Sequence, residues 1–253
     1  MAEVEIEIAG RVMVVAINRT EARNAANRAV AVAIAEAVDA LDERDDLSAG
    51  VITGRGGTFC AGMDLKAFLR GELARVEGRG FAGLTERLPS KPLIAAVEGH
   101  ALAGGFELAL ACDLIVAAED ARFGLPEVKR GLVANAGGLM RLPRQLPFRM
   151  AMELVLTGEQ VKAGDLHRLG LINRLVPNGG ALAAALALAE TIAQNGPMAL
   201  AVSKRVMLES QDWPSTEMFQ RQRQITAPVF ASADAREGAL AFAEKRKPNW
   251  QGR

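Results

Sequence analysis

Apolar and polar residues alternate at the start of the chain. Residues 4–8 read Val-Glu-Ile-Glu-Ile, the period-two pattern of a half-buried strand. A Gly-Arg turn leads into a second apolar run at 12–17, so the pattern predicts a β-hairpin. A polar loop over residues 18–24 comes next. Residues 29–41 then carry apolar side chains at helical spacing, which predicts a helix.

Short apolar segments farther along the chain predict buried strands. They are residues 49–53, 93–97 and 113–118. The first two are followed by glycine-rich loops, 54–62 and 99–105. Each loop leads into an expected helix, one running from an Asp64 N-cap through residue 69 and one at 106–111. Because strand, glycine-rich loop and helix recur in this order, the chain is predicted to form a layered α/β fold.

The rest of the chain has a different character. Residues 71–87 contain four glycines, a pattern that predicts a mobile loop or a weak helix. Helices broken at Pro197 and Pro214 are predicted over residues 181–194, 198–209, 216–224 and 233–244. We therefore expect a core at 1–195 and a C-terminal helical region at 196–253. An apolar region of this kind is expected to pack on the core or on another subunit.

Composition excludes several classes of protein. The 253 residues include 30 Lys plus Arg and 30 Asp plus Glu, so the formal charge is zero and neither nucleic acid nor a membrane surface is an expected partner. No apolar run of about 18 residues predicts a membrane span. Cys60 and Cys112 cannot form a disulfide framework, and a reducing, cytoplasmic location is expected.

Motifs of several common enzyme classes are also missing. The two histidines form no His-Glu-x-x-His pattern, no metal site is expected, and no Gly-x-Ser-x-Gly nucleophile motif occurs. The loop at 99–105 lacks the lysine of an ATP-binding loop, and residues 54–57 do not complete a dinucleotide fingerprint.

The two glycine-rich loops, 54–62 and 99–105, could have a different function. If they face each other, they would direct two backbone N–H groups at one oxygen, which is an oxyanion hole. The alternative is that each loop is merely a tight turn.

At this point the residues resemble a known family, the crotonase or enoyl-CoA hydratase/isomerase superfamily. The resemblance rests on motifs in the family's order: Thr58-Phe59-Cys60-Ala61-Gly62-Met63-Asp64-Leu65-Lys66, residues 91–109, Phe123-Gly124-Leu125-Pro126-Glu127, Gly137-Gly138 and residues 242–250. It spans almost the whole chain. It implies an α/β crotonase-type spiral of ββα repeats with a helical C-terminal region. It further implies a homotrimer, or a homohexamer made of two trimers.

The resemblance also implies roles for individual residues. The backbone N–H groups of Met63 and Gly104 would form the oxyanion hole, and Glu107 and Glu127 match the two glutamates of true hydratases. This implies an enoyl-CoA hydratase, a lyase of fatty acid metabolism and β-oxidation that uses no cofactor, since CoA is part of the substrate. Glu127 would give a proton to Cα while Glu107 activates water, and two nearby carboxylates have divergent pKa values. Considered alone, Glu107 is also a favourable acid in a first helical turn.

Further residues are implied to contact the substrate. Those matching CoA-binding positions are Arg23, Ala61, Leu65, Lys66, Phe242 and Lys245, the last from a neighbouring subunit. Asn135 either caps the following helix or reaches the acyl pocket. Met63, Asn135 and Ala103 depart from the residues common in the family. Surface solvation is the ordinary interpretation of the lysines and arginines.

Other side chains near the motifs are interpreted as structural. Cys60 is expected to be a packing residue, His100 a polar residue at a strand end, and Asp113 a capping or pairing residue. Two alternatives to the hydratase stay open. One is an acyl-CoA isomerase or a carnitinyl-CoA-like dehydratase on the same scaffold, and the other is a silent acyl-CoA-binding protein.

Overall fold

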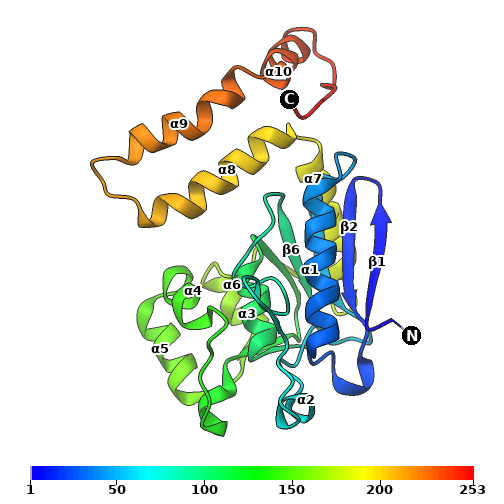
Figure 1. The fold of residues 1–253 in the computed structure, drawn as a ribbon, viewed down its shortest axis with the longest axis vertical. Coiled ribbons are helices and arrows are strands. Elements are labelled where there is room, and N and C mark those ends of the chain that lie inside the picture. Colours follow the sequence, from blue (N-terminus) through cyan, green and yellow to red (C-terminus); the bar gives the residue numbers. More distant parts are fainter. Residues whose placement is uncertain (1) are drawn as a thin grey trace.

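A six-stranded sheet forms the centre of the molecule (Figure 1). The computed structural model describes residues 2–253. In spatial order the strands are β1 (Val4–Ala9), β2 (Val12–Ile17), β3 (Ala49–Gly54), β6 (Leu93–Val97), β8 (Leu114–Ala118) and β11 (Arg174–Val176). β1 is antiparallel to β2, and every other neighbouring pair is parallel. The predictions of a hairpin and of an α/β fold are confirmed.

Helices cover both faces of the central strands of this sheet, and successive side chains of a strand point to opposite faces. In β2, Val12 and Val14 pack with the helix α7 (Ala181–Ala193). Met13 and Val15 pack on the other side. That second face is covered by α1 (Arg28–Glu43) and α3 (Gly104–Ala111), and Figure 1 shows α1 and α7 on opposite sides of the sheet.

Two smaller sheets lie in regions where the sequence analysis expected none. One consists of β7 (His100–Leu102), β9 (Arg122–Gly124) and β10 (Val161–Lys162). The other pairs β4 (Arg75–Val76) with β5 (Gly80–Phe81). The weak helix predicted as one alternative at 71–87 is therefore wrong, because this segment is a loop that contains β4 and β5, and the loop predicted at 99–105 contains a strand. Strands of two or three residues are too short to show a period-two pattern.

Further helical segments complete the fold. They are η1 (Thr20–Ala22), α2 (Leu65–Leu69), η2 (Pro126–Arg130), α4 (Gly138–Gln145), α5 (Phe148–Thr157), α6 (Ala163–Arg168), α8 (Pro197–Glu209), η3 (Ser210–Asp212), α9 (Met218–Phe230) and α10 (Ala233–Ala243). Asp64 caps α2 as predicted, since its Oδ1 accepts hydrogen bonds from the N–H groups of Lys66 and Ala67. α9 continues beyond its predicted end at residue 224 through Pro228.

The helices α8, α9 and α10 extend away from the sheet (Figure 1). α8 is fixed to the core by Lys204, whose Nζ donates to Asp113 Oδ2 at 2.7 Å and to the carbonyl oxygen of Lys91 at 3.0 Å. Asp113 thus has the pairing role expected of it. Along the described chain, no helix has the length and apolarity needed to cross a membrane. The division into a core and a C-terminal oligomerisation region stays a prediction.

Candidate functional site

The two glycine-rich loops meet at one edge of the main sheet. They follow β3 and β6, which are parallel neighbours, so both leave the sheet at the same end. Three backbone hydrogen bonds join them. Phe59 N–H donates to the Glu98 carbonyl at 2.9 Å, Cys60 N–H to the His100 carbonyl at 2.9 Å, and Leu102 N–H to the Cys60 carbonyl at 3.0 Å. The arrangement proposed from the sequence, two loops facing each other, is present.

Close contact between the loops depends on glycine. A Cβ atom at Gly105 would lie 2.1 Å from the carbonyl oxygen of Cys60, and one at Gly99 would lie 2.3 Å from that of Gly57. Any side chain at either position would force the loops apart. Cys60 is fully buried, and burial raises the pKa of its thiol to about 11, so it stays protonated as a packing residue.

Two N–H groups from these loops are available to a ligand. Met63 and Gly104 both line a cavity of about 390 Å³. Among residues 2–253, neither of these N–H groups has a hydrogen-bond acceptor. Gly104 is the first residue of α3, where the partial positive charge of the helix end favours an anionic oxygen. These properties are those required of an oxyanion hole.

Ala103 holds the Gly104 peptide in a strained conformation. Its φ of 52° and ψ of −129° lie in a region that glycine adopts readily and alanine rarely. Its N–H donates to the Gly124 carbonyl, and its own carbonyl accepts from Phe106 and Glu107. The surrounding hydrogen bonds therefore impose the conformation that leaves the Gly104 N–H free. Strain of this kind typically costs about 1–3 kcal/mol.

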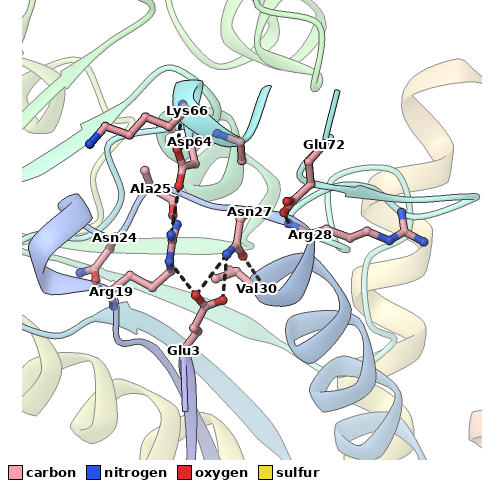
Figure 2. Close-up of polar contacts among 12 residues, drawn as sticks. Glu3, Arg19, Asn24, Ala25, Asn27, Arg28, Val30, Asp64, Lys66 and Glu72 are labelled. Carbon is pink, nitrogen blue, oxygen red and sulfur yellow. Dashed lines mark hydrogen bonds and ion pairs between the residues drawn. The ribbon is translucent and has the colours of Figure 1, made fainter. Parts of the chain in front are cut away.

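A polar network positions the loop that carries Met63 (Figure 2). Arg19 lies at its centre, with Nη2 3.0 Å from Asp64 Oδ2 and Nε 3.0 Å from Glu3 Oε1. The side chains of Arg19 and Asp64 are only 12% and 14% exposed, so this pair is largely shielded from water. Asn27 caps α1 through the Val30 N–H and donates from Nδ2 to Glu3. The network thus joins the N-terminal segment, α1 and α2.

Backbone pairing next to this network orients the Met63 peptide. Ala26 N–H donates to the Gly62 carbonyl at 2.7 Å, and Asp64 N–H donates to the Ala26 carbonyl at 2.8 Å. Because backbone groups alternate in direction along an extended segment, the Met63 N–H points away from Ala26. Met63 itself lines the cavity.

Glu107 is buried at the wall of this cavity. It lies in the first turn of α3 and is only 2% exposed. Its Oε1 accepts two backbone hydrogen bonds, from Ala136 N–H at 2.7 Å and from Gly138 N–H at 2.8 Å. Burial raises the pKa of Glu107, while these N–H groups and the charge of Arg141 oppose that shift. The hydrogen bonds favour its ionised form.

Glu127 lines the same cavity with a different environment. It follows Pro126 in η2 and is half-buried, and its Oε2 is a buried atom with no hydrogen-bond partner within residues 2–253. Burial, with a smaller contribution from the charge of Glu107, raises the pKa of Glu127 to about 7 against the opposing effects of its own backbone N–H and of Arg130. A carboxyl in this state keeps its proton near neutral pH and can donate it.

Apolar side chains form much of the remaining cavity wall. They include Phe68, Leu73, Phe81, Leu132 and Val133. Asn135 also lines the cavity, whereas the N-cap of α4 is Gly137 without a side-chain bond. The capping alternative for Asn135 is therefore wrong, and its predicted place at the acyl pocket agrees with its position.

The residues matched to CoA binding fall into two groups. Ala61 and Leu65 line the cavity. Arg23 and Lys66 are exposed on flanking segments, and the Arg23 carbonyl accepts from Ala61 N–H. Phe242, which is 88% exposed, and Lys245 lie at the end of α10, at the opposite end of the molecule from α2 (Figure 1). A single chain does not bring this second group to the cavity.

Some contributors to the site were missed in the sequence. Gly137-Gly138 was noted as a motif, but the N–H groups of Ala136 and Gly138 were given no role. Arg141 was not singled out either, although a cation in a first helical turn opposes the helix dipole and is an unusual choice. Within the described part of the chain, no group of three or more His, Cys, Asp or Glu is arranged to hold a metal ion.

Comparison with known proteins agrees with this geometry. A family model described as enoyl-CoA hydratase/isomerase matches residues 7–253. The chain belongs to the enoyl-CoA hydratase/isomerase family. The resemblance stated from its motifs is therefore confirmed.

Individual members of the enoyl-CoA hydratase/isomerase family match over nearly the full chain. Enoyl-CoA hydratase EchA19 of Mycobacterium tuberculosis is 42% identical, over 98% of this chain and 96% of that protein. Carnitinyl-CoA dehydratase of Salmonella enteritidis is 41% identical, over 96% of each. The crystal structure of enoyl-CoA hydratase EchA1 from Mycobacterium marinum superimposes with a TM-score of 0.98 at 57% identity, covering all of both chains. The crotonase-type fold is confirmed.

The Arg19–Asp64 pair predicts a measurable effect on the site. Asp64→Ala removes both the α2 cap and the partner of a shielded guanidinium, so we expect the free energy of unfolding to fall by about 2 kcal/mol. Because the Met63 N–H would lose its support, kcat/KM for a hydratase substrate should fall as well. Denaturant titration and steady-state kinetics measure the two effects.

Asp46→Ala is the matched control for this experiment. Asp46 pairs with Arg44 at the surface, where both side chains are well exposed, and its removal should leave stability and kinetics unchanged. An Asp64→Ala protein as stable and as active as the Asp46→Ala protein would show that the network does not hold the loop.

Proposed function

We propose that this protein is an enoyl-CoA hydratase, a hydro-lyase that adds water reversibly across the α,β-double bond of an enoyl-CoA thioester. The observation that carries the proposal is the convergence on one cavity of two free N–H groups, from Met63 and Gly104, and two carboxyl groups, from Glu107 and Glu127. The names of its relatives agree with this activity.

The environment of each N–H group and each carboxyl group suits one step of the hydration reaction. The thioester oxygen accepts hydrogen bonds from Met63 N–H and Gly104 N–H, which stabilise the enolate-like charge that forms when hydroxide adds to Cβ. Ionised Glu107 accepts the proton of the attacking water, and protonated Glu127 donates a proton to Cα. After one addition Glu107 holds a proton and Glu127 lacks one, so exchange with solvent restores the starting state.

The two carboxyl environments support this division of roles. Two short backbone hydrogen bonds stabilise a negative charge on Glu107, whereas a buried oxygen of Glu127 has no such bond within the described residues. A pKa of about 7 keeps a large fraction of Glu127 protonated at neutral pH. A silent acyl-CoA-binding protein would have no use for two carboxyls with opposed proton states at one cavity.

A second candidate function is dehydration of a 3-hydroxyacyl-CoA such as a carnitinyl-CoA-like substrate. A relative named carnitinyl-CoA dehydratase is 41% identical over nearly the whole chain. Dehydration is the reverse of the proposed reaction and needs the same two carboxyls. Double-bond migration by an isomerase is the remaining alternative, and it proceeds without water uptake. Parallel assays with crotonyl-CoA, a 3-enoyl-CoA and 3-hydroxyacyl-CoA esters separate the three.

We further propose that the CoA portion binds at the rim of the cavity and across a subunit boundary. Ala61 and Leu65 line the cavity, and Arg23 and Lys66 are exposed cations on the segments beside it. Phe242 and Lys245 are distant within one chain, so they would act from a neighbouring subunit. Asn135 would contact the acyl group.

The exposed apolar residues of the C-terminal helices support self-association into a homotrimer or a homohexamer. They include Met207, Phe219, Phe230 and Phe242, each more than 70% exposed.

We also propose a reducing, cytoplasmic setting, supported by the free, buried Cys60 and Cys112. We propose a role in β-oxidation or related fatty acid metabolism without a separate cofactor.

The glutamate pair gives the test of the proposed function. Glu107→Gln and Glu127→Gln keep the side-chain volume but remove proton transfer, so each should lower hydration by about 100-fold or more. CoA-ester binding should change little, because the N–H groups are unaffected. Glu127→Gln should also abolish solvent-proton exchange at Cα. Since both groups act in the same addition reaction, the double variant should be far less than additive.

Glu153→Gln on the exposed surface of α5 is the control, and it should match the unmodified enzyme. Hydration by either active-site variant at a rate close to that control would contradict the mechanism.

The proposed assembly predicts a trimer or larger species in solution. Analytical ultracentrifugation should find no monomer at micromolar concentration, and Lys245→Ala should weaken CoA-ester binding by about tenfold through one lost charge contact. A stable, fully active monomer would eliminate both the assembly and the cross-subunit role of Lys245.

A further inference from the structure

Arg141 is a half-buried arginine that the proposed mechanism does not use. It lies in the first turn of α4, and its guanidinium points back to the loop that precedes this helix. Nη2 donates to the Thr85 carbonyl at 2.6 Å, and Nη1 donates to the Ala136 carbonyl at 3.4 Å. Arg141 thus joins the segment after β5 to the loop at 135–138.

The same loop supplies the hydrogen bonds to Glu107. The Ala136 residue donates its N–H to Glu107 Oε1 while its carbonyl accepts from Arg141. Gly138, the first residue of α4, donates the second N–H to the same oxygen. Holding the Ala136 carbonyl therefore also holds the peptide groups that bind the carboxylate.

The guanidinium of Arg141 occupies a space that depends on Gly137. A Cβ atom at Gly137, where φ is +104°, would lie 2.0 Å from Nη1 of Arg141, so the absence of a side chain there creates the space. A cation at the start of a helix opposes the helix dipole. Its burial is also costly, and this cost is offset by nearby acceptors and negative charge.

The charge of Arg141 acts on Glu107, and it also acts on the buried thiol of Cys112. It lowers the pKa of Glu107 against the effect of burial, and Glu107 in turn supports the charge of Arg141. The groups that act on the glutamate are Arg141 and the N–H groups of Ala136 and Gly138. The cation that acts on Glu127 is a different one, Arg130, whose charge lowers the pKa of Glu127.

We propose that Arg141 is a positioning residue that fixes the 135–138 loop against Glu107 and keeps Glu107 the ionised member of the carboxyl pair. This inference rests on the proposed hydratase function. It explains why two carboxyls at one cavity take opposite proton states rather than exchanging roles. Arg141 contacts neither substrate nor water in this account and acts through the loop and through its charge.

The test is the pH profile of kcat/KM for crotonyl-CoA in Arg141→Met, Arg141→Lys and Arg144→Met. Removing the positive charge disfavours ionised Glu107, so the acid limb in Arg141→Met should move up by about one pH unit. At pH values well below the acid limb of both enzymes, activity should then fall about tenfold, and it should recover toward the unmodified value as pH rises. KM should stay within about twofold, and Arg141→Lys should restore part of the shift because it keeps the charge.

Arg144→Met is the matched control on the same helix. Arg144 is 54% exposed and pairs with Asp212 at the surface, so its removal should leave the profile unchanged. A uniform loss of activity at every pH in Arg141→Met, with the acid limb unmoved, would reduce Arg141 to a structural residue and overturn the proposal. An acid limb that moves equally in both methionine variants would overturn it as well.

A second measurement does not require turnover. Infrared difference titration of the protonated carboxyl band, assigned by its loss in Glu107→Gln, should show Glu107 titrating at higher pH in Arg141→Met than in the unmodified protein. If the protein hydrates none of the enoyl-CoA esters, the proposed function fails, and this titration still decides the role of Arg141. An unshifted Glu107 band would overturn it.

Discussion

The backbone contact between the loop after β3 and the loop after β6 is the constraint on which the site depends. Its centre is Cys60, whose N–H and carbonyl both pair with the segment 100–102 and whose carbonyl lies where a Gly105 side chain would be. This contact brings the Met63 and Gly104 peptides to one cavity. It also places the N-terminus of α3, and with it Glu107, beside them.

Two kinds of support keep this geometry fixed from outside. The Arg19–Asp64 pair and the Ala26 backbone hold the Met63 segment, and the strained Ala103 is held by hydrogen bonds to Gly124 and α3. The N–H donors are thus fixed before a substrate binds, which is how an oxyanion hole avoids reorganisation during reaction. The same principle applies to the carboxyls, where N–H groups at the start of α4 stabilise a charge on Glu107.

Much of this was predictable from the sequence, for identifiable reasons. Some signals are local in the sequence, and the structure has the elements that they predict. They are the period-two pattern of β1, the apolar runs of β3 and β6, and the Asp64 cap. The burial of Glu107 followed from its apolar and glycine neighbours. The short strands β4, β5, β7 and β9 to β11 and the helices α5 and α6 were missed, and a helix after Asn135 was expected without bounds. Strands of two or three residues show no period, and residues 119–180 were not assigned to elements.

The supports of the site were harder to foresee because they join distant segments. Arg141 reaches Thr85 across 56 positions, and Arg19 reaches Asp64 across 45. Neither contact leaves a pattern in the local sequence. The predicted CoA-binding role of Phe242 and Lys245 requires a second subunit. A sequence motif does not show where that subunit lies, so the structure of a single chain does not test this role.

The central claim is that Met63 N–H and Gly104 N–H both donate hydrogen bonds to the thioester oxygen, in a cavity that also contains the two glutamates. A crystal structure of the enzyme with acetoacetyl-CoA, a thioester that lacks the double bond, tests it most directly. The account predicts that the thioester oxygen lies about 2.7–3.1 Å from both backbone nitrogens, with Glu127 facing the α carbon and Glu107 facing the β carbon. A thioester oxygen bound elsewhere, with either N–H unoccupied, would contradict the account.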